Sequence, residues 1–197
     1  MPSYLKYNRH LPQFKVVEKY FSEEEVDKII DLEDLQEFTN GKVGSNQKGG
    51  SLDKGARDSE ISWLVPSPQS QWVFDRFGVL VGQVNHDVFM YDIDGFDTFQ
   101  YTKYKKNQHY DWHFDVHTEY LTWERKISGV VILSDPDEYV GGELEVINNG
   151  SPEKAFCSKL NKGDVIFFAS WMSHRVRPVT KGVRRSLVAW IMGKRVC

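Results

Sequence analysis

The second half of the chain is a succession of short segments rich in β-branched and aromatic residues. Six such segments are separated by glycine, aspartate, asparagine and proline, and they occupy residues 96–104, 109–117, 125–135, 142–148, 164–170 and 184–193. Segments of this length and composition are typical of β-strands joined by turns. The pattern therefore predicts an antiparallel β-core over about residues 96–197.

The first half of the chain carries two helical patterns, and residues 12–21 ahead of them are typical of a short strand. Residues 22–38 begin with Ser22 as an N-cap residue and Glu25 three positions later, which is the spacing of a capping box. Residues 67–90 place bulky apolar side chains at helical spacing. We expect helical support over about residues 1–95, packed on one side of a mainly β fold, with residues 1–197 forming a single domain.

Residues 39–60 are rich in glycine and contain almost no large apolar residue, so they are predicted to form a long loop. A lid over a binding site and a plain disordered insertion are the two interpretations of a loop of this length.

Composition excludes several classes of protein. The formal net charge is −3, which gives no support to nucleic-acid binding. Cys157 and Cys197 lie far apart and show no metal-type pairing. The sequence has no N-terminal apolar targeting region and no run of 18 apolar residues. We expect a soluble cytoplasmic protein that binds neither nucleic acid nor membrane.

Two histidines and one aspartate form the strongest candidate site. His113 and Asp115 are two residues apart, so on a strand both would face the same side, and His174 follows at the end of another predicted strand. Two imidazoles and one carboxylate are the ligands of mononuclear non-haem iron(II) oxygenases. His109 and His117 are nearby alternatives, but several same-face ligands on one strand could not converge on one ion unless the strand broke.

Two adjacent arginines on the last predicted strand are candidates for anion binding. Arg184 and Arg185 must face opposite sides of a strand, and both sides carry apolar residues, so periodicity alone does not choose between them. An inward-facing arginine needs a partner, and a bound dicarboxylate would supply one.

Together these residues match a wider pattern. The chain resembles the 2-oxoglutarate- and iron(II)-dependent dioxygenases, and within them the prolyl 4-hydroxylase-like group, over about residues 96–193. The matching motif residues are Tyr104, Tyr110, His113, Asp115, Gly141 through Leu144, Gly163, Asp164, His174, Pro178, Gly182, Arg184, Ser186 and Trp190. The resemblance implies a double-stranded β-helix, or jelly roll. One departure is the turn before Tyr110, where relatives have glycine and where Asn107 is expected to adopt the positive φ.

The resemblance also implies roles for these residues. His113, Asp115 and His174 would be the iron ligands and the catalytic centre. Arg184 would pair with the distal carboxylate of 2-oxoglutarate, with Tyr104 and Ser186 beside that co-substrate. The substrate contacts expected from stacking, from bidentate hydrogen bonding and from the family pattern are Tyr110, Trp112, Arg57 and Trp190. Trp63 is a further candidate, for which ordinary packing is the stronger interpretation.

The implied activity is hydroxylation of an unactivated C–H bond with Fe(II), 2-oxoglutarate and O2, stimulated by ascorbate, and its expected substrate is proline in a peptide or protein. A hydroxylase of a free amino acid or small metabolite is the alternative enzyme. A jelly-roll binding module without turnover and a structural zinc site are the non-catalytic alternatives. A structural zinc site usually has four closed ligands, often cysteines, and neither cysteine here is placed for one.

Overall fold

A computed structural model describes residues 14–33, 37–43, 51–96, 98–116, 123–147, 155–157 and 160–194. Its larger sheet is antiparallel and has the strand order β1 (Phe14–Val17), β11 (Val165–Ala169), β7 (Trp123–Ile132), β14 (Arg184–Lys194), β5 (Phe99–Tyr104), β4 (Glu60–Leu64) and β2 (Thr39–Asn40). The smaller sheet has the order β10 (Ala155–Cys157), β9 (Leu144–Ile147), β12 (His174–Val176), β6 (His109–His113) and β3 (Arg57–Asp58). A separate pair joins β13 (Val179–Gly182) to β8 (Tyr139–Gly141), which follows a 3₁₀ turn at Pro136–Glu138.

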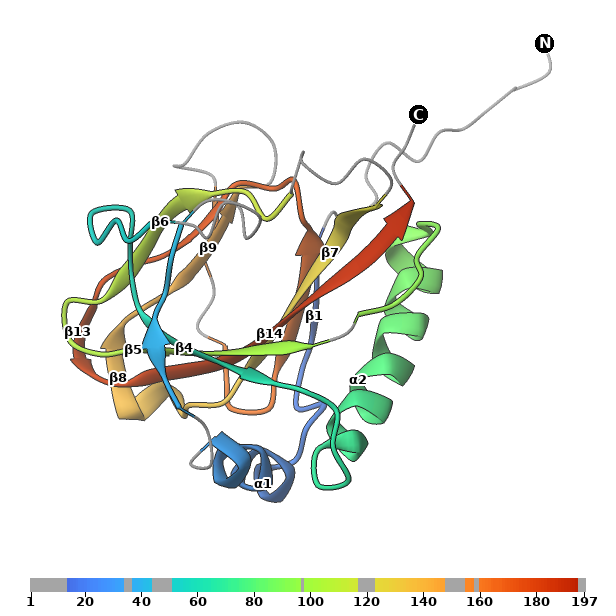
Figure 1. Ribbon diagram of the computed structural model, residues 1–197, viewed down its shortest axis with the longest axis horizontal. Coiled ribbons are helices and arrows are strands. Elements are labelled where there is room, and N and C mark those ends of the chain that lie inside the picture. Colours follow the sequence, from blue (N-terminus) through green and yellow to red (C-terminus); the bar gives the residue numbers. More distant parts are fainter. Residues whose placement is uncertain are drawn as a thin grey trace, which may run out of the picture.

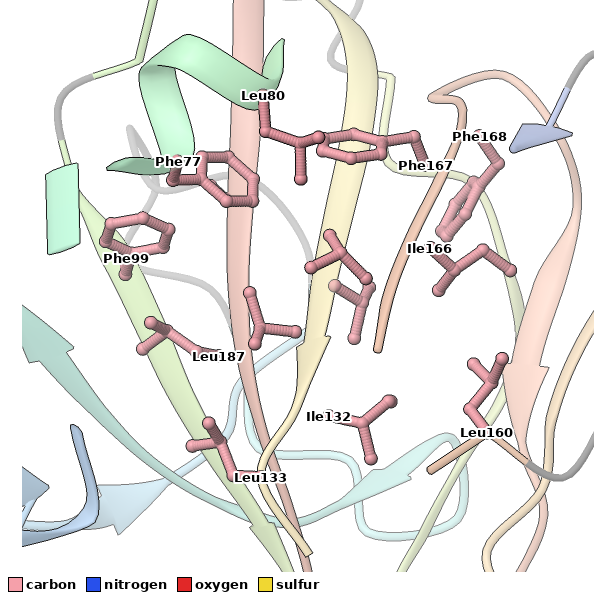
Figure 2. Close-up of a cluster of buried hydrophobic side chains, with 14 of the residues drawn as sticks. Phe77, Leu80, Phe99, Ile132, Leu133, Leu160, Ile166, Phe167, Phe168 and Leu187 are labelled. Atoms are coloured by element: carbon pink, nitrogen blue, oxygen red, sulfur yellow. The ribbon is translucent and has the colours of Figure 1, made fainter. Parts of the chain in front are cut away.

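The larger sheet has two different faces. Helices α1 (Glu23–Glu33) and α2 (Gln71–Val84) lie on its outer side, away from the smaller sheet (Figure 1). Phe77 of α2 packs edge-to-face on Phe99 and also contacts Phe167, so aromatic rings fill this layer (Figure 2). The opposite face of the sheet looks toward the smaller sheet. Because β11 is covered on both faces, all five of its residues are buried.

The helices follow the sequence patterns with shorter limits. The predicted capping box forms, since the Ser22 amide donates to the Glu25 carboxylate at 2.9 Å and the Glu25 amide donates to the Ser22 hydroxyl at 3.2 Å. The first helix ends at Glu33, and residues 34–36 of the predicted helix lie outside the described residues. The second starts at Gln71 and continues into a π turn, Asn85–Phe89. None of the helices in the described ranges has the length and apolar character to cross a membrane.

The six strands predicted in the second half are present, as is the short strand predicted over residues 12–21, which forms β1, but the strand count was too low. Residues 39–60 were predicted to be a loop, yet they contribute β2, β3 and the first residue of β4, while residues 44–50 lie outside the described part of the chain. The polar composition of this region was misleading because pairing with β5 and β6 supplies the strand-forming contacts. The predicted strand 109–117 was also too long, since β6 ends at His113. Strands β4, β8, β10, β12 and β13 were also not predicted.

Position 163 requires glycine, both for its backbone conformation and for lack of space around it. Its φ is +86°, and a Cβ there would lie 2.1 Å from the carbonyl oxygen of Phe21. Gly163→Ala is therefore expected to destabilise the protein by about 2 kcal/mol or more, since the left-handed conformation alone costs about 1–2 kcal/mol for a residue with a side chain. Urea unfolding would measure the change.

Gly78→Ala is the matched control. Gly78 lies inside α2, and a Cβ there would meet nothing within 4 Å. Alanine is a better helix former, so we expect stabilisation by about 0.5–1 kcal/mol. Equal effects of the two substitutions would contradict this account of Gly163.

Candidate metal centre

A cavity of about 890 Å³ opens between the two sheets. Its lining combines residues of β5, β7 and β14 from the larger sheet with residues of β6, β9 and β12 from the smaller one. All of the site residues predicted from the sequence reach this cavity: Arg57, Tyr104, Tyr110, Trp112, His113, Asp115, His174, Arg184, Ser186 and Trp190.

His113, Asp115 and His174 form one cluster inside the cavity, with one ligand atom of each within 4.8 Å of the others. His174 is the first residue of β12 and pairs directly with His113 at the end of β6. Asp115 lies two residues beyond β6, and its amide donates to the carbonyl of Ser170 at 2.9 Å. The prediction that Asp115 shares a strand with His113 is therefore wrong. A backbone hydrogen bond from the loop after β6 brings Asp115 to the site instead.

The two imidazoles are oriented by their backbone neighbours. Nδ1 of His113 lies 2.8 Å from the carbonyl oxygen of Asp111, and Nδ1 of His174 lies 2.9 Å from that of Met172. A carbonyl only accepts, so each Nδ1 carries a proton, and in a neutral imidazole this leaves the Nε2 lone pair free for a metal. The Nε2 atoms lie 3.7 Å and 3.4 Å from the two carboxylate oxygens of Asp115. This is the tautomer that a metal-binding histidine needs.

Electrostatics favour the deprotonated forms of His113 and Asp115. Burial, reinforced by His174, lowers the pKa of His113 to about 3, so its contact with Asp115 is not an ion pair near neutral pH. Burial acts to raise the pKa of Asp115, but its interactions with His174 and His113 hold it well below its usual range. A neutral imidazole and an ionised carboxylate are the states in which these groups bind metals.

The donor set fits iron(II). Among the described residues the cluster contains three ligand side chains, two nitrogen donors and one oxygen donor. Two histidines and one carboxylate with open positions are typical of non-haem iron(II) oxygenases, whereas structural zinc sites close four ligands. Cys157 is exposed and free, which gives no support to a zinc site, and Cys197 lies outside the described residues.

Arg184 forms a second charged feature of the cavity. Its side chain is buried at 2% exposure, and one guanidinium nitrogen donates to the Ser186 hydroxyl at 3.2 Å. Tyr104 lies beside it, with the ring centre 5.7 Å from the guanidinium carbon. Within the part of the chain that the structure describes, Arg184 has no ion-pair partner. A buried guanidinium without a counter-ion is costly, so the cavity is suited to an anion at this position.

The open choice between the two arginines is resolved geometrically. Arg184, Ser186, Val188 and Trp190 line the cavity, whereas Leu187, Ala189 and Ile191 are buried in the hydrophobic core. Arg185 does not line the cavity. The expected positive φ of Asn107 is also confirmed, at 71°.

Tyr110 lies between the cluster and Arg57. Its ring stacks on His113 with centres 3.5 Å apart, and the Arg57 guanidinium lies 4.6 Å above it. Burial raises the pKa of Tyr110 to about 12, so its hydroxyl stays protonated. Arg57 donates to the Ser59 hydroxyl at 2.9 Å and the Gln100 side chain at 2.8 Å. These bonds occupy much of its donor capacity, so its predicted role in binding substrate stays a prediction.

Two tryptophans predicted to contact substrate, Trp112 and Trp190, pack against arginine side chains. Arg175 lies 4.6 Å over the Trp112 ring and Arg125 lies 3.8 Å over the Trp190 ring. Trp63, for which packing was the stronger interpretation, lines the cavity 6.2 Å from Trp190 and is 39% exposed.

Sequence reasoning missed Arg125 and Ser128. Arg125 lines the cavity, and the Ser128 hydroxyl donates to Asp115 at 2.7 Å. Ser128 and the cavity-lining Val130 are two residues apart on β7, so their side chains face the same side of the sheet. This alternation is the sequence signal that could have placed Ser128 near the site. His109 contacts the carbonyl of Gly55 outside the cluster, and His117 lies outside the described residues.

Comparison with known proteins gives matches in sequence. Residues 99–192 match the sequence profile of the 2OG-Fe(II) oxygenase superfamily. A PKHD-type hydroxylase of Teredinibacter turnerae is 47% identical over 68 residues, which are 33% of this chain and 27% of that protein. The PKHD-type hydroxylase YbiX of Escherichia coli is 34% identical over 95 residues, 46% of this chain and 41% of that protein. The chain thus spans less than half the length of these curated relatives.

Solved structures match almost the whole chain. A prolyl-4-hydroxylase of Pseudomonas putida has a TM-score of 0.71 at 16% identity, over 93% of this chain and 94% of that one. A prolyl hydroxylase of Trichoplax adhaerens, in complex with a peptide fragment of hypoxia inducible factor, has a TM-score of 0.73 at 18% identity, over 91% and 83%. At these identities the likeness shows the fold, so the predicted jelly-roll core with packed helices is confirmed.

Proposed function

We propose that this chain, whose residues 99–192 match the 2OG-Fe(II) oxygenase superfamily, hydroxylates an unactivated C–H bond of proline in a peptide or protein. The family implies Fe(II), 2-oxoglutarate and O2 as the reactants. The observation that carries the proposal is that a three-ligand metal cluster and a buried arginine without an ion-pair partner among the described residues share one cavity.

Each of these residues has a task in the proposed reaction. His113, Asp115 and His174 would hold Fe(II) through two nitrogens and one oxygen. When bound, the iron supplies the oxidising chemistry that couples decarboxylation of 2-oxoglutarate, to succinate and carbon dioxide, to insertion of one oxygen atom into a C–H bond.

Arg184 and Ser186 would fix the co-substrate. The guanidinium offers two parallel N–H donors to the distal carboxylate of 2-oxoglutarate, which replaces the missing counter-ion. Tyr104 lies beside this position with its hydroxyl protonated, because burial raises its pKa. These side chains would orient the dicarboxylate, and the walls of the cavity would limit its contact with water.

Three observations support proline in a peptide as the substrate. The cavity of about 890 Å³ is large compared with a five-carbon dicarboxylate, so it has room for a substrate segment beside the co-substrate. Trp63 and Trp190 offer apolar surfaces in the same cavity, which suit a pyrrolidine ring. The Pseudomonas putida and Trichoplax adhaerens proteins of the same fold are described as prolyl hydroxylases.

The test is turnover of 2-oxoglutarate to succinate with Fe(II), ascorbate and O2, with and without a panel of proline-containing peptides. We expect peptide-stimulated succinate formation and a peptide product heavier by one oxygen atom. Peptide-independent turnover would favour a free amino acid or small metabolite as substrate. Absence of turnover in protein with iron bound would overturn the enzyme assignment and favour a binding module. The cytoplasmic location expected from the sequence stays a prediction.

A further inference from the structure

The Asp115 carboxylate reaches the cluster without the support of a strand. His113 and His174 are held in register by the pairing of β6 with β12, whereas Asp115 lies in the irregular segment after β6. A metal ligand in such a segment needs other contacts to fix its orientation, because a carboxylate that can adopt several orientations binds a metal more weakly.

Two buried serines supply those contacts. Ser128 and Ser170 are both 0% exposed. Ser128 lies on β7, and Ser170 directly follows the neighbouring strand β11. The Ser128 hydroxyl donates to Oδ2 of Asp115 at 2.7 Å, and its oxygen lies 3.0 Å from the Ser170 hydroxyl. The Ser170 carbonyl also accepts the Asp115 amide at 2.9 Å. Asp115 is thus held at its backbone and at its carboxylate.

The direction of the hydrogen bonds follows from donor counting. An ionised carboxylate only accepts, so the single hydroxyl hydrogen of Ser128 is used on Asp115. The contact between the two serines must then be donated by Ser170. The chain runs from Ser170 through Ser128 to Oδ2, and it leaves Oδ1 without a hydroxyl donor among the described residues.

We propose that Ser128, supported by Ser170, is a positioning residue that reserves one oxygen of Asp115 and so presents the other to a metal. A carboxylate that offers one oxygen uses one coordination position. A metal held in this way would keep its other positions available for the co-substrate and oxygen. This inference rests on the proposed metal site and is independent of the identity of the hydroxylated substrate.

The test is anoxic titration of the full chain with Co(II), which reports its ligands through its visible spectrum. Ser128→Ala is expected to weaken Co(II) binding by about 10- to 100-fold and to change that spectrum, since loss of a partner to a metal ligand has effects of this size. Ser170→Ala is expected to have a smaller effect in the same direction. The thermal midpoint of the metal-free protein is measured for each variant.

Ser134→Ala is the control. Ser134 is also 0% exposed, and its hydroxyl bonds to the backbone of Val183 and Arg185, away from the cluster. Co(II) affinity in this variant should match that of the unmodified chain. Unchanged affinity and spectrum in Ser128→Ala would overturn the proposal. If that variant does not fold, Ser170→Ala decides, because it must bind Co(II) more weakly than Ser134→Ala. Failure of the unmodified chain to bind Co(II) would instead contradict the proposed metal site.

Discussion

Asp115→Ala is expected to abolish tight binding of Fe(II) and, with it, all turnover of 2-oxoglutarate. The substitution removes the only carboxylate of the cluster and leaves two imidazoles, of which His113 stays neutral. Two imidazole nitrogens alone neither complete the ligand set nor balance the charge of a divalent ion. Anoxic titration with Fe(II), followed by the succinate assay, would measure both losses.

Asp111→Ala is the matched control for this experiment. Asp111 also lines the cavity, but its carboxylate accepts the Trp112 amide at 2.8 Å and takes no part in the cluster. Only its backbone carbonyl contacts His113, and the substitution retains that carbonyl. Metal binding should survive in Asp111→Ala. Loss of metal in this variant, with retention in Asp115→Ala, would show that the ligand set is wrong.

Arg184→Ala is expected to raise the 2-oxoglutarate requirement by about 10- to 100-fold while metal binding is retained. Hydrogen bonds to charged groups contribute about 1.5–3 kcal/mol, and each 1.4 kcal/mol corresponds to about a factor of ten. The effect should appear in the dissociation constant of 2-oxoglutarate for the metal-loaded protein and in its KM.

The neighbouring arginine tests the register of β14. Arg185 lies outside the cavity lining, so Arg185→Ala should leave 2-oxoglutarate binding close to that of the unmodified chain. Arg184→Lys keeps a positive charge but loses the two parallel donors, and we expect an intermediate affinity. A strong effect of Arg185→Ala, without one of Arg184→Ala, would contradict the proposed co-substrate position.

Local signals in the sequence were sufficient for much of the fold. The Ser22 and Glu25 capping box formed because its contacts involve neighbouring residues only. Asn107 adopted a positive φ because its short polar side chain tolerates that conformation. Spacing and resemblance together singled out three residues that the fold gathers into one cluster of potential metal ligands.

Long-range pairing explains what the sequence did not reveal. Arg57 and Asp58 form a strand because β6 pairs with them, and no local property of this glycine-rich region indicates that. Arg125 has the strand parity of the core-facing Ile127, yet it lines the cavity. The register of β7 on β14 skips Lys126, since Ile191 pairs with Ile127 and Met192 with Arg125. This β-bulge reverses which side chains face inward.

The central claim is that the cluster and Arg184 together make this chain a 2-oxoglutarate-dependent oxygenase. The most direct measurement is anaerobic loading with Fe(II) and 2-oxoglutarate, followed by exposure to isotopically labelled dioxygen and mass analysis of the succinate. The account predicts one labelled oxygen atom in each succinate, and no such product from Asp115→Ala. Protein that is folded and loaded with iron, but that forms no labelled succinate with any peptide or amino acid tested, would contradict it.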